Sequence, residues 1–456
     1  MHYFYRVSIL LCLYLSTTLQ AHAQKDTLKV MAYNVLYLGN GCAGPLANTV
    51  AHFNNVLSFA QPDLLALEKV GSIPTSDTDA FGTAPKGFAD SLLRNGLQSI
   101  PNKTYAYCPF TNYAQANNIC LLYYNTQKLG YAGMVSTYSN ITDFNTYKLY
   151  IKDPYLSQTK DTTFLYITLN HDKSGDEFEL VRFLQIEGNM QCLKDHFHHL
   201  GNHLNLGDFN VRTSEERFYK LLTQGKDSAF NFYDPPFFPD RKLKYPANWD
   251  HDPVYTPYFT TSTRENPNVP NNCGSGGGGK NWYDHIFISN WIKNNTNYIR
   301  YIPNSYRTVG NDGKRFRISI INKNGTPNNA APDTVLASMF QLSNKYPVMV
   351  DLEVTYNKEG KSPIDGEIPH PKTVYMDEIT VSNPIEKELN IHFPATMLGQ
   401  EISIHLYDAA NQEVLSQAFT LKQPEKSFKC SVQPGKYILK ILGKHNQIAS
   451  LPVIKL

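Results

Sequence analysis

The chain has little cysteine, almost no net charge and a single long apolar run. Only seven of its 456 residues are cysteines, and its formal net charge is +2. The balanced charge gives no argument for electrostatic steering toward nucleic acid. The cysteines are too dispersed for a zinc cluster. Beyond Cys12, an even number of cysteines remains: Cys42, Cys108, Cys120, Cys192, Cys273 and Cys430. The sequence cannot choose among their possible disulfide pairings.

The long apolar run lies at the N-terminus and is typical of an export signal. Arg6 supplies a positive start, Val7–Leu15 an apolar centre, and Ala21-His22-Ala23 a small-x-small cleavage site. We therefore predict a signal peptide over residues 1–23. An uncleaved anchor is the alternative, but the run is too short to span a bilayer comfortably. No other stretch approaches its length, so we expect a soluble mature protein.

Residues 24–356 are predicted to form one large domain. Short apolar runs alternate there with helix-like stretches such as Ala47–Ala60 and Phe178–His199. This alternation indicates an α/β (α+β) architecture in which helices cover the sheets. Long polar connections, at 235–282 and 303–334, are expected on the surface. The predicted strands are Leu28–Asn34, Leu64–Val70, Ile119–Tyr124, Phe164–His171, His203–Asn210, Tyr283–Ser289 and Tyr346–Thr355.

The character of the sequence changes after residue 356. Residues 357–372 form a polar, Pro- and Gly-bearing linker. Residues 373–456 contain short alternating runs separated by turn residues, which is the pattern of a small all-β sandwich. The predicted strands of this domain are Glu388–Phe393, Glu401–Tyr407, Gln412–Thr420, Ser427–Val432 and Lys436–Leu442.

Three segments of the last domain resemble the type IX secretion sorting domain of Bacteroidetes proteins. They are Asn383-Pro384, Ile404–Asp408 and Gln433–Ile441. The resemblance implies export through the periplasm and across the outer membrane, with the secretion machinery of that membrane as a partner. The expected location is the cell surface or the medium. An ordinary carbohydrate-binding sandwich is the alternative.

Polar residues stand at the ends of several strands of the large domain. Asn34 ends the first strand, His171 ends another, and Asp284 opens a third. Metal-assisted cleavage of a phosphoester needs hard oxygen ligands for Mg²⁺, a group that activates water, and donors for the phosphate. Each of these residues taken singly is a weak signal. Their order along the chain carries more weight.

The most specific segment is Gly207-Asp208-Phe209-Asn210. Asp208 and Asn210 are two residues apart, so both side chains are expected to leave the same face of a strand. In order and context, these motifs resemble those of the endonuclease/exonuclease/phosphatase superfamily, from about Leu28 to Thr355. The resemblance implies a four-layer α/β/β/α sandwich with its site at one rim.

The same resemblance implies roles for the motif residues. Asn34 would contact metal or phosphate, and His171 would bind phosphate and stabilise the transition state. Asp208 and Asn210 would position the attacking water and the phosphate, and Asp284 would orient the catalytic histidine. The implied cofactor is Mg²⁺ or Mn²⁺, and the implied substrate is a phosphodiester, with nucleic acid among the candidates.

Two motifs depart from the family pattern. The second motif is typically Pro-Asp, an apolar run and Gln-Glu-Val, in which the glutamate binds the metal. Here the segment from Pro62 to Val70 has Lys69 in the glutamate's place and Glu68 one residue early. Because strand side chains alternate, Glu68 is expected to point away from Lys69. Only a bulge would return Glu68 to the site as a metal ligand.

The last motif is typically Ser-Asp-His-Leu-Pro-Val, in which the histidine is the general base. Here Ser343 and Pro347 flank Asn344 at the aspartate position and Lys345 at the histidine position. With Lys69, these changes add about four positive charges where Mg²⁺ needs anionic ligands. An ordinary lysine near neutral pH is protonated and cannot accept a proton. We therefore expect hydrolysis to be weak or lost.

Three functional hypotheses remain open. The first is a secreted metal-dependent phosphodiesterase or nuclease. The second, favoured by Lys69, Asn344 and Lys345, is a non-cleaving protein that binds phosphate, nucleic acid or an anionic glycan. The third is a structural or surface-interaction module, and a monomer is expected in each case.

The segment Gly274–Asn281 nearly matches a phosphate-binding P-loop, but it lacks the Ser/Thr and precedes a strand, so we interpret it as a flexible loop.

Overall fold

The computed structural model describes residues 25–38, 46–71, 83–114, 116–267, 274–321, 327–368, 379–408, 412–443 and 447–456. The predicted signal peptide lies outside these ranges, as do Cys42 and Cys273. Cys108, Cys120, Cys192 and Cys430 are all buried and free, so no disulfide joins these four. A search of the described helices for one of sufficient length and apolarity to cross a membrane found none.

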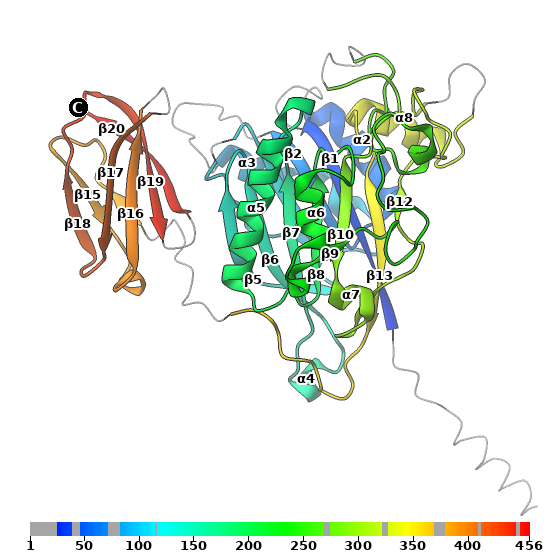
Figure 1. Cartoon of the computed structure of the whole chain (residues 1–456), viewed down its shortest axis with the longest axis horizontal. Coiled ribbons are helices and arrows are strands. Elements are labelled where there is room, and N and C mark those ends of the chain that lie inside the picture. The colour runs from blue at the N-terminus through cyan, green and yellow to red at the C-terminus, as the bar shows by residue number, and fades with distance from the viewer. Residues whose placement is uncertain are drawn as a thin grey trace, which may run out of the picture.

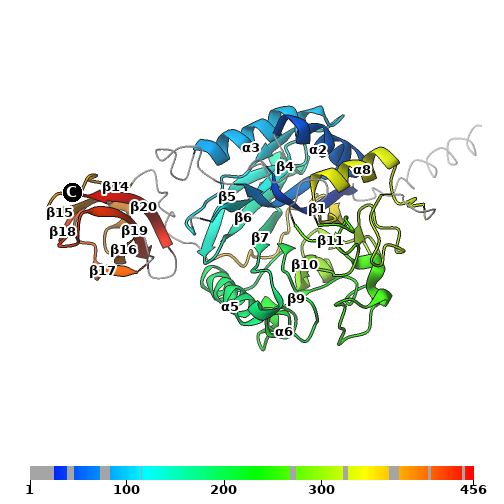
Figure 2. The same ribbon diagram turned by 90° about the horizontal axis from the view of Figure 1, so that it is seen from above.

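Two sheets packed face to face form the centre of the large domain, and helices cover both outer faces (Figure 1 and Figure 2). The first sheet has the strand order β11-β13-β1-β2-β4-β3, with β12 also paired to β13. The second has the order β5-β6-β7-β8-β10-β9. In Figure 2, α2, α3 and α8 lie over the first sheet, and α5 and α6 lie on the far side of the second. The predicted four-layer α/β/β/α sandwich is confirmed.

The strands of the first sheet are β1 (Lys25–Leu38), β2 (Leu64–Gly71), β3 (Tyr105–Tyr107), β4 (Asn118–Asn125), β11 (Ile299–Tyr301), β12 (Arg307–Thr308) and β13 (Val348–Thr355). Those of the second are β5 (Leu129–Ser139), β6 (Asp143–Ile151), β7 (Phe164–His171), β8 (His203–Asp208), β9 (Phe232–Tyr233) and β10 (Asp284–Ser289). The helices are α2 (Leu46–Ala60), α3 (Thr83–Asn95), α4 (Leu156–Thr159), α5 (Glu179–His196), α6 (Arg217–Gln224), α7 (Asn290–Asn294) and α8 (Asp333–Leu342).

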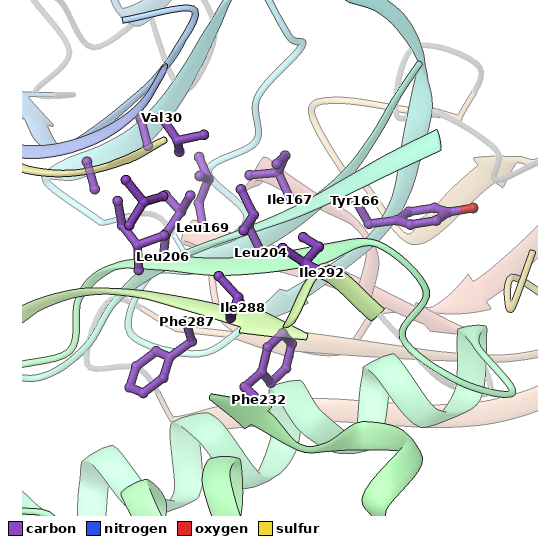
Figure 3. Packing of buried hydrophobic residues seen from close by; sticks show 14 of the residues in the cluster. Val30, Tyr166, Ile167, Leu169, Leu204, Leu206, Phe232, Phe287, Ile288 and Ile292 are labelled. Atoms are coloured by element: carbon purple, nitrogen blue, oxygen red, sulfur yellow. The ribbon is translucent and has the colours of Figure 1, made fainter. Parts of the chain in front are cut away.

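Alternation of side chains along each strand builds the layers. In β1, Val30 and Ala32 belong to the core between the sheets, whereas Met31 and Tyr33 belong to the core under the helices of the first sheet. Figure 3 shows Val30 opposite Leu169 and Leu206 of the second sheet, with Phe232 and Phe287 on the side of the covering helices. Both faces of these strands are buried, which explains their nearly continuous apolar sequences.

Most predicted strands are found, and their differences from the prediction have local causes. The strand predicted over His203–Asn210 stops at Asp208, because Asn210 has a φ of 49° and cannot continue a strand. The long connection 235–282 does not lie on the surface as a whole. Trp249 and the stretch Thr260–Arg264 are buried, so this connection forms part of the body of the domain.

The segment 357–368, predicted to begin a linker, lies against the large domain as a strap. The backbone nitrogen of Asn357 donates to Asp153, and its Nδ2 donates to Asp161 Oδ2 at 2.8 Å. Further along, the nitrogen of Ile368 donates to the carbonyl oxygen of His196 at 2.8 Å. These contacts hold the strap across the ends of the second sheet.

The C-terminal domain is a small sandwich of two sheets. One has the order β14-β15-β18 and the other β17-β16-β19-β20. Burial alternates along β15 and β16, and their inward residues share one apolar cluster with β18 and β19. The strands are β14 (Thr380–Val381), β15 (Glu388–His392), β16 (Glu401–Tyr407), β17 (Glu413–Thr420), β18 (Glu425–Lys429), β19 (Gly435–Gly443) and β20 (Gln447–Lys455).

Gly207 is required by the close approach of β7 and β8. It has a φ of 139°, and a Cβ built there would lie 2.0 Å from the carbonyl oxygen of Asn170. Gly207→Ala should therefore lower the free energy of unfolding by about 3 kcal/mol, measured by urea denaturation. The matched control is Gly133→Ala, which has a φ of 152° but open space around the new methyl group. Equal losses for the two variants would contradict the steric explanation.

Candidate functional site

Strand register brings the motif residues to one rim of the sandwich. His171 ends β7 beside Asp208, which ends β8, and Asp284 opens β10 opposite Asp208. In the first sheet, Asn34 of β1 is the partner of Glu68 of β2. The cleft at this rim has a volume of about 490 Å³. The sequence-predicted residues that line it are Asn34, Lys69, His171, Asp208, Asn210, Asn344 and Lys345, while Glu68 and Asp284 are buried next to it.

The ammonium group of Lys345 lies between two buried carboxylates. Its Nζ is 2.8 Å from Asp208 Oδ2 and 3.6 Å from Asp284 Oδ2. Nδ2 of Asn34 donates to the same Asp208 oxygen at 2.8 Å. The ring centroid of Tyr283 is 4.6 Å from the Lys345 Nζ, so this cation also lies over an aromatic face. The ammonium is therefore held by an ion pair with Asp208, by the nearby Asp284 and by the face of an aromatic ring.

The charges of this cluster stabilise one another. Burial opposes the charge on Lys345, but Asp208 and Asp284 raise the pKa of Lys345 above the ordinary lysine value. Burial also opposes the charge on Asp208, yet Lys345, His171 and the hydrogen bond from Asn34 hold the pKa of Asp208 below its usual range. Burial raises the pKa of Asp284, and the neighbouring Asp208 adds to this effect against Lys345. At neutral pH the site holds a charged Lys345–Asp208 pair.

The prediction that Glu68 points away from the site is wrong. The pairing of β2 with β4 contains a bulge between Leu67 and Val70, and Lys69 has a φ of 60°. A residue in the left-handed region interrupts the alternation of side chains, so neighbours need not lie on opposite faces. Glu68 is buried where the charges of the two aspartates act on it, and Lys69 lines the cleft.

Glu68 and Lys69 have pKa values shifted toward their neutral forms. Burial raises the pKa of Glu68, the two aspartates add to this effect, and neither carboxyl oxygen has a hydrogen-bond partner. Burial lowers the pKa of Lys69 to about 8, against the attraction of Asp208. The Nζ of Lys69 lies 4.5 Å from the ring centroid of Tyr37. Lys69 forms no ion pair with any of the described residues, so it can meet an anion that enters the cleft.

His171 is held by a residue that the sequence analysis did not identify. Its Nδ1 donates to Oδ1 of Asn118 at 2.8 Å. Burial lowers the pKa of His171 to about 4, Asp208 opposes this effect, and Lys69 and Lys345 add to it. The imidazole is therefore neutral at neutral pH. Asp284, predicted to orient the catalytic histidine, lies beside Lys345, the residue at that histidine's position. Asn118 was detectable only as a polar residue just before the predicted strand Ile119–Tyr124.

Asn210 reaches the cleft from beyond the end of β8. The prediction that Asp208 and Asn210 share a strand face is therefore wrong, because Asn210 does not belong to the strand. The backbone nitrogen of Asn210 donates to Asp208 Oδ1 at 3.0 Å, and its Nδ2 donates to the carbonyl oxygen of Asp172 at 2.9 Å. Asn344 lies across the cleft, and its Nδ2 donates to Ser275 Oγ at 2.8 Å. Both asparagines are thus fixed by local hydrogen bonds.

The glycine-rich segment 274–281, interpreted as a flexible loop, forms a wall of the cleft. The backbone nitrogens of Gly277 and Gly278 donate to the carbonyl oxygens of Glu265 and Arg264, each at 2.8 Å. Lys280 from this segment lines the cleft. The sequence could not show this, because the backbone groups that bind the segment approach it only in the folded chain.

The carboxylates of the site do not fit a divalent cation as they stand. Asp208, Asp284 and Glu68 supply oxygens of the kind that Mg²⁺ binds. The Lys345 ammonium, however, already lies between the two aspartates and repels a dication at that point. Within the described ranges, no three His, Cys, Asp or Glu side chains are grouped so that they could hold a metal ion. The chain itself therefore supplies a cation to these two aspartates.

Comparison with known families identifies the C-terminal domain. Residues 382–455 match the model of the secretion system C-terminal sorting domain. The chain is therefore exported by type IX secretion, to the cell surface or the medium. No curated protein matches the chain.

Among solved structures, the chain is similar to endonuclease/exonuclease/phosphatase proteins. One from Beutenbergia cavernae has 12% identity and a TM-score of 0.42, with 94% of this chain and 99% of that chain covered. One from Bacteroides thetaiotaomicron has 13% identity and a TM-score of 0.42, with 74% and 100% covered. The human Nocturnin catalytic domain with bound sulfate anion has 13% identity and a TM-score of 0.41, with 72% and 97% covered. We infer the roles of the cleft residues from the geometry of the cleft in this chain alone.

The Lys345 ion pair should contribute strongly to stability. Lys345→Met leaves two aspartates buried without their cation, so we expect the free energy of unfolding at neutral pH to fall by about 3 kcal/mol. The measurement is urea denaturation of the mature chain. Lys69→Met is the matched control, since it removes a buried ammonium from the same cleft without breaking an ion pair. A loss as large in the control as in Lys345→Met would contradict the central place of this ion pair.

Proposed function

We propose that this exported protein is of the endonuclease/exonuclease/phosphatase type and binds a phosphate or phosphodiester group in its cleft without a divalent metal, with little or no hydrolysis. The observation that carries the proposal is the Lys345 ammonium between Asp208 and Asp284. This ammonium neutralises carboxylates that would otherwise repel a phosphate, and it opposes the binding of Mg²⁺ between them.

The remaining charges of the cleft support the binding of an anion. Lys69, Lys280 and Arg212 line it together with Lys345, against the carboxylates of Asp208 and Asp176. Both carboxylates have cationic partners, since Asp208 pairs with Lys345 and Asp176 pairs with Arg212. Lys69 and Lys280 then remain to neutralise an incoming phosphate. Charge-assisted hydrogen bonds of this kind are stronger than neutral ones.

The same geometry argues against efficient hydrolysis. A general base must accept a proton at the working pH. Lys345 is protonated, and Asp208 is already occupied by an ammonium and an amide donor. The neutral imidazole of His171 is the one feature that favours a residual phosphodiesterase as the second candidate. With its Nδ1 donating to Asn118, its other ring nitrogen is unprotonated.

Binding is tested by titration calorimetry of the mature chain with inorganic phosphate and with a thymidine dinucleotide. We expect the same affinity in EDTA as in Mg²⁺. Lys69→Gln should weaken binding about tenfold, because a charge-assisted hydrogen bond is lost. Lys220→Gln is the control, since Lys220 pairs with Glu215 at the surface and should not affect binding. Binding that requires Mg²⁺ would overturn the proposal.

Hydrolysis is tested with bis(4-nitrophenyl) phosphate and plasmid DNA in Mg²⁺ or Mn²⁺. We expect no turnover above that of Asp208→Ala. The triple variant Lys69→Glu, Asn344→Asp and Lys345→His removes the internal ammonium and returns anionic ligands, so it should gain Mg²⁺ binding by calorimetry and measurable turnover. Metal-dependent turnover by the unmodified chain, lost in Asp208→Ala, would establish the second candidate instead.

A further inference from the structure

The outer face of the larger sheet of the C-terminal domain carries a serine, a histidine and a glutamate in hydrogen-bond contact. Burial alternates along β16, whose Ser403 and His405 face away from the core. Nε2 of His405 lies 3.0 Å from Oγ of Ser403, and its Nδ1 lies 2.9 Å from Oε2 of Glu413 on β17. Both ring nitrogens therefore have a partner, and the three side chains form one chain of hydrogen bonds.

The carboxylate of Glu413 fixes the tautomer of the imidazole. The hydrogen bond from His405 holds the pKa of Glu413 below its ordinary value, so this side chain is a carboxylate at neutral pH. A carboxylate only accepts hydrogen bonds, so the Nδ1 beside it carries the proton. In the neutral ring Nε2 is then unprotonated, and it accepts the hydrogen bond of the Ser403 hydroxyl. Tyr407 also donates to Glu413 Oε2, at 3.2 Å, which holds the carboxylate in place.

Strand register determines what surrounds the serine. β16 pairs with β17 on one side and with β19 on the other, and Figure 1 shows the three strands side by side. Ala418 of β17 and Leu442 of β19 lie directly opposite Ser403. Directly opposite residues of an antiparallel pair share a face of the sheet, so apolar side chains flank the hydroxyl on both sides. A short acyl group on Ser403 would therefore have apolar contacts.

A serine is activated for acyl transfer by this order of groups. The base must lie within hydrogen-bond reach of the hydroxyl proton, and a carboxylate must hold the base in the tautomer that can accept it. Ser403, His405 and Glu413 meet both requirements at the distances given above. Ser403 and His405 are partly exposed, so a small molecule can reach both from the solvent.

We propose that this face of the C-terminal domain hydrolyses small carboxylic esters through an acyl-serine intermediate. Ser403 Oγ attacks the carbonyl carbon of the ester while its proton passes to His405 Nε2. The bond from that carbon to the alcohol oxygen breaks, and the alcohol leaves with the proton from Nε2. Water then attacks the acyl group with His405 again as the base. The bond to Ser403 Oγ breaks, the carboxylic acid is released, and the proton returns to the serine.

The carboxylate acts through the histidine. Glu413 contacts the imidazole and not the ester, so it is a positioning residue for His405. This site lies on the C-terminal domain and shares no residue with the cleft of the large domain. Its test therefore does not depend on the proposed function.

The test uses the chain from residue 24 onward, with the C-terminal domain in place. A fluorophosphonate probe should label the chain, and peptide mass spectrometry should locate the label on Ser403. Hydrolysis of p-nitrophenyl acetate should be about 100-fold faster than in Ser403→Ala, the lower end of what general-base catalysis supplies. The lower end is expected because the backbone N–H groups around Ser403 serve the two strand pairings and not an oxyanion. His405→Gln should lose both labelling and hydrolysis.

Two further variants separate the role of each partner of the imidazole. Glu413→Gln keeps a hydrogen-bond partner for His405 but removes its charge. It should lower the rate constant of labelling about tenfold and leave the affinity for the probe unchanged. Ser416→Ala is the matched control, because the Ser416 hydroxyl lies 3.1 Å from Nδ1, the protonated nitrogen, and not from the base nitrogen. Labelling and hydrolysis in this variant should equal those of the unmodified chain.

Circular dichroism of each variant shows whether the C-terminal domain keeps its fold. The proposal is overturned if ester hydrolysis persists in a folded Ser403→Ala, which would place the activity elsewhere on the chain. It is also overturned if the probe labels Ser403 no faster than Ser427. Ser427 lies on the same domain, and its hydroxyl donates to Asn390 rather than to a histidine.

Discussion

The cleft depends on one buried ion pair, that of Lys345 with Asp208, and on the second carboxylate, Asp284, beside it. Buried carboxylates repel one another and lose hydration, so a cluster of them needs a cation. An enzyme can take that cation from solution as Mg²⁺. Here the chain provides it, and the site is neutralised in every molecule whatever the metal concentration. A tethered ammonium also cannot bridge a substrate and a water as an exchangeable metal can, and for this reason we propose binding without efficient hydrolysis.

Strand register explains why so much of this site could be predicted from the sequence. His171, Asp208 and Asp284 occupy adjacent register positions on β7, β8 and β10, so recognising three strands placed three polar residues together. Lys345 was equally visible as a departure from the motif that its flanking residues resemble. These conclusions depended on local alternation and chain order, which a single sequence displays.

What could not be predicted depended on backbone conformation set by the fold. Alternation predicted that Glu68 and Lys69 point to opposite faces, but the left-handed Lys69 places both at the cleft. The same holds for Asn210, whose φ ends β8 two residues early. The place of the glycine-rich segment at the cleft was missed for a related reason, since its hydrogen-bond partners lie ten or more residues away and meet it only after folding. Non-local constraints of this kind leave no periodic trace in the sequence.

The two rims of the large domain differ in the charged residues that line them. At the cleft, lysines outnumber free carboxylates, and the buried Glu68 and Asp284 have raised pKa values, so the local field suits an anion. At the far rim, where Phe164 opens β7, a second cavity is lined by Asp161 and Asp365, which outnumber the single lysine of its lining. The linings of the two rims therefore differ in the sign of their charge, and only the charge of the cleft suits an anion.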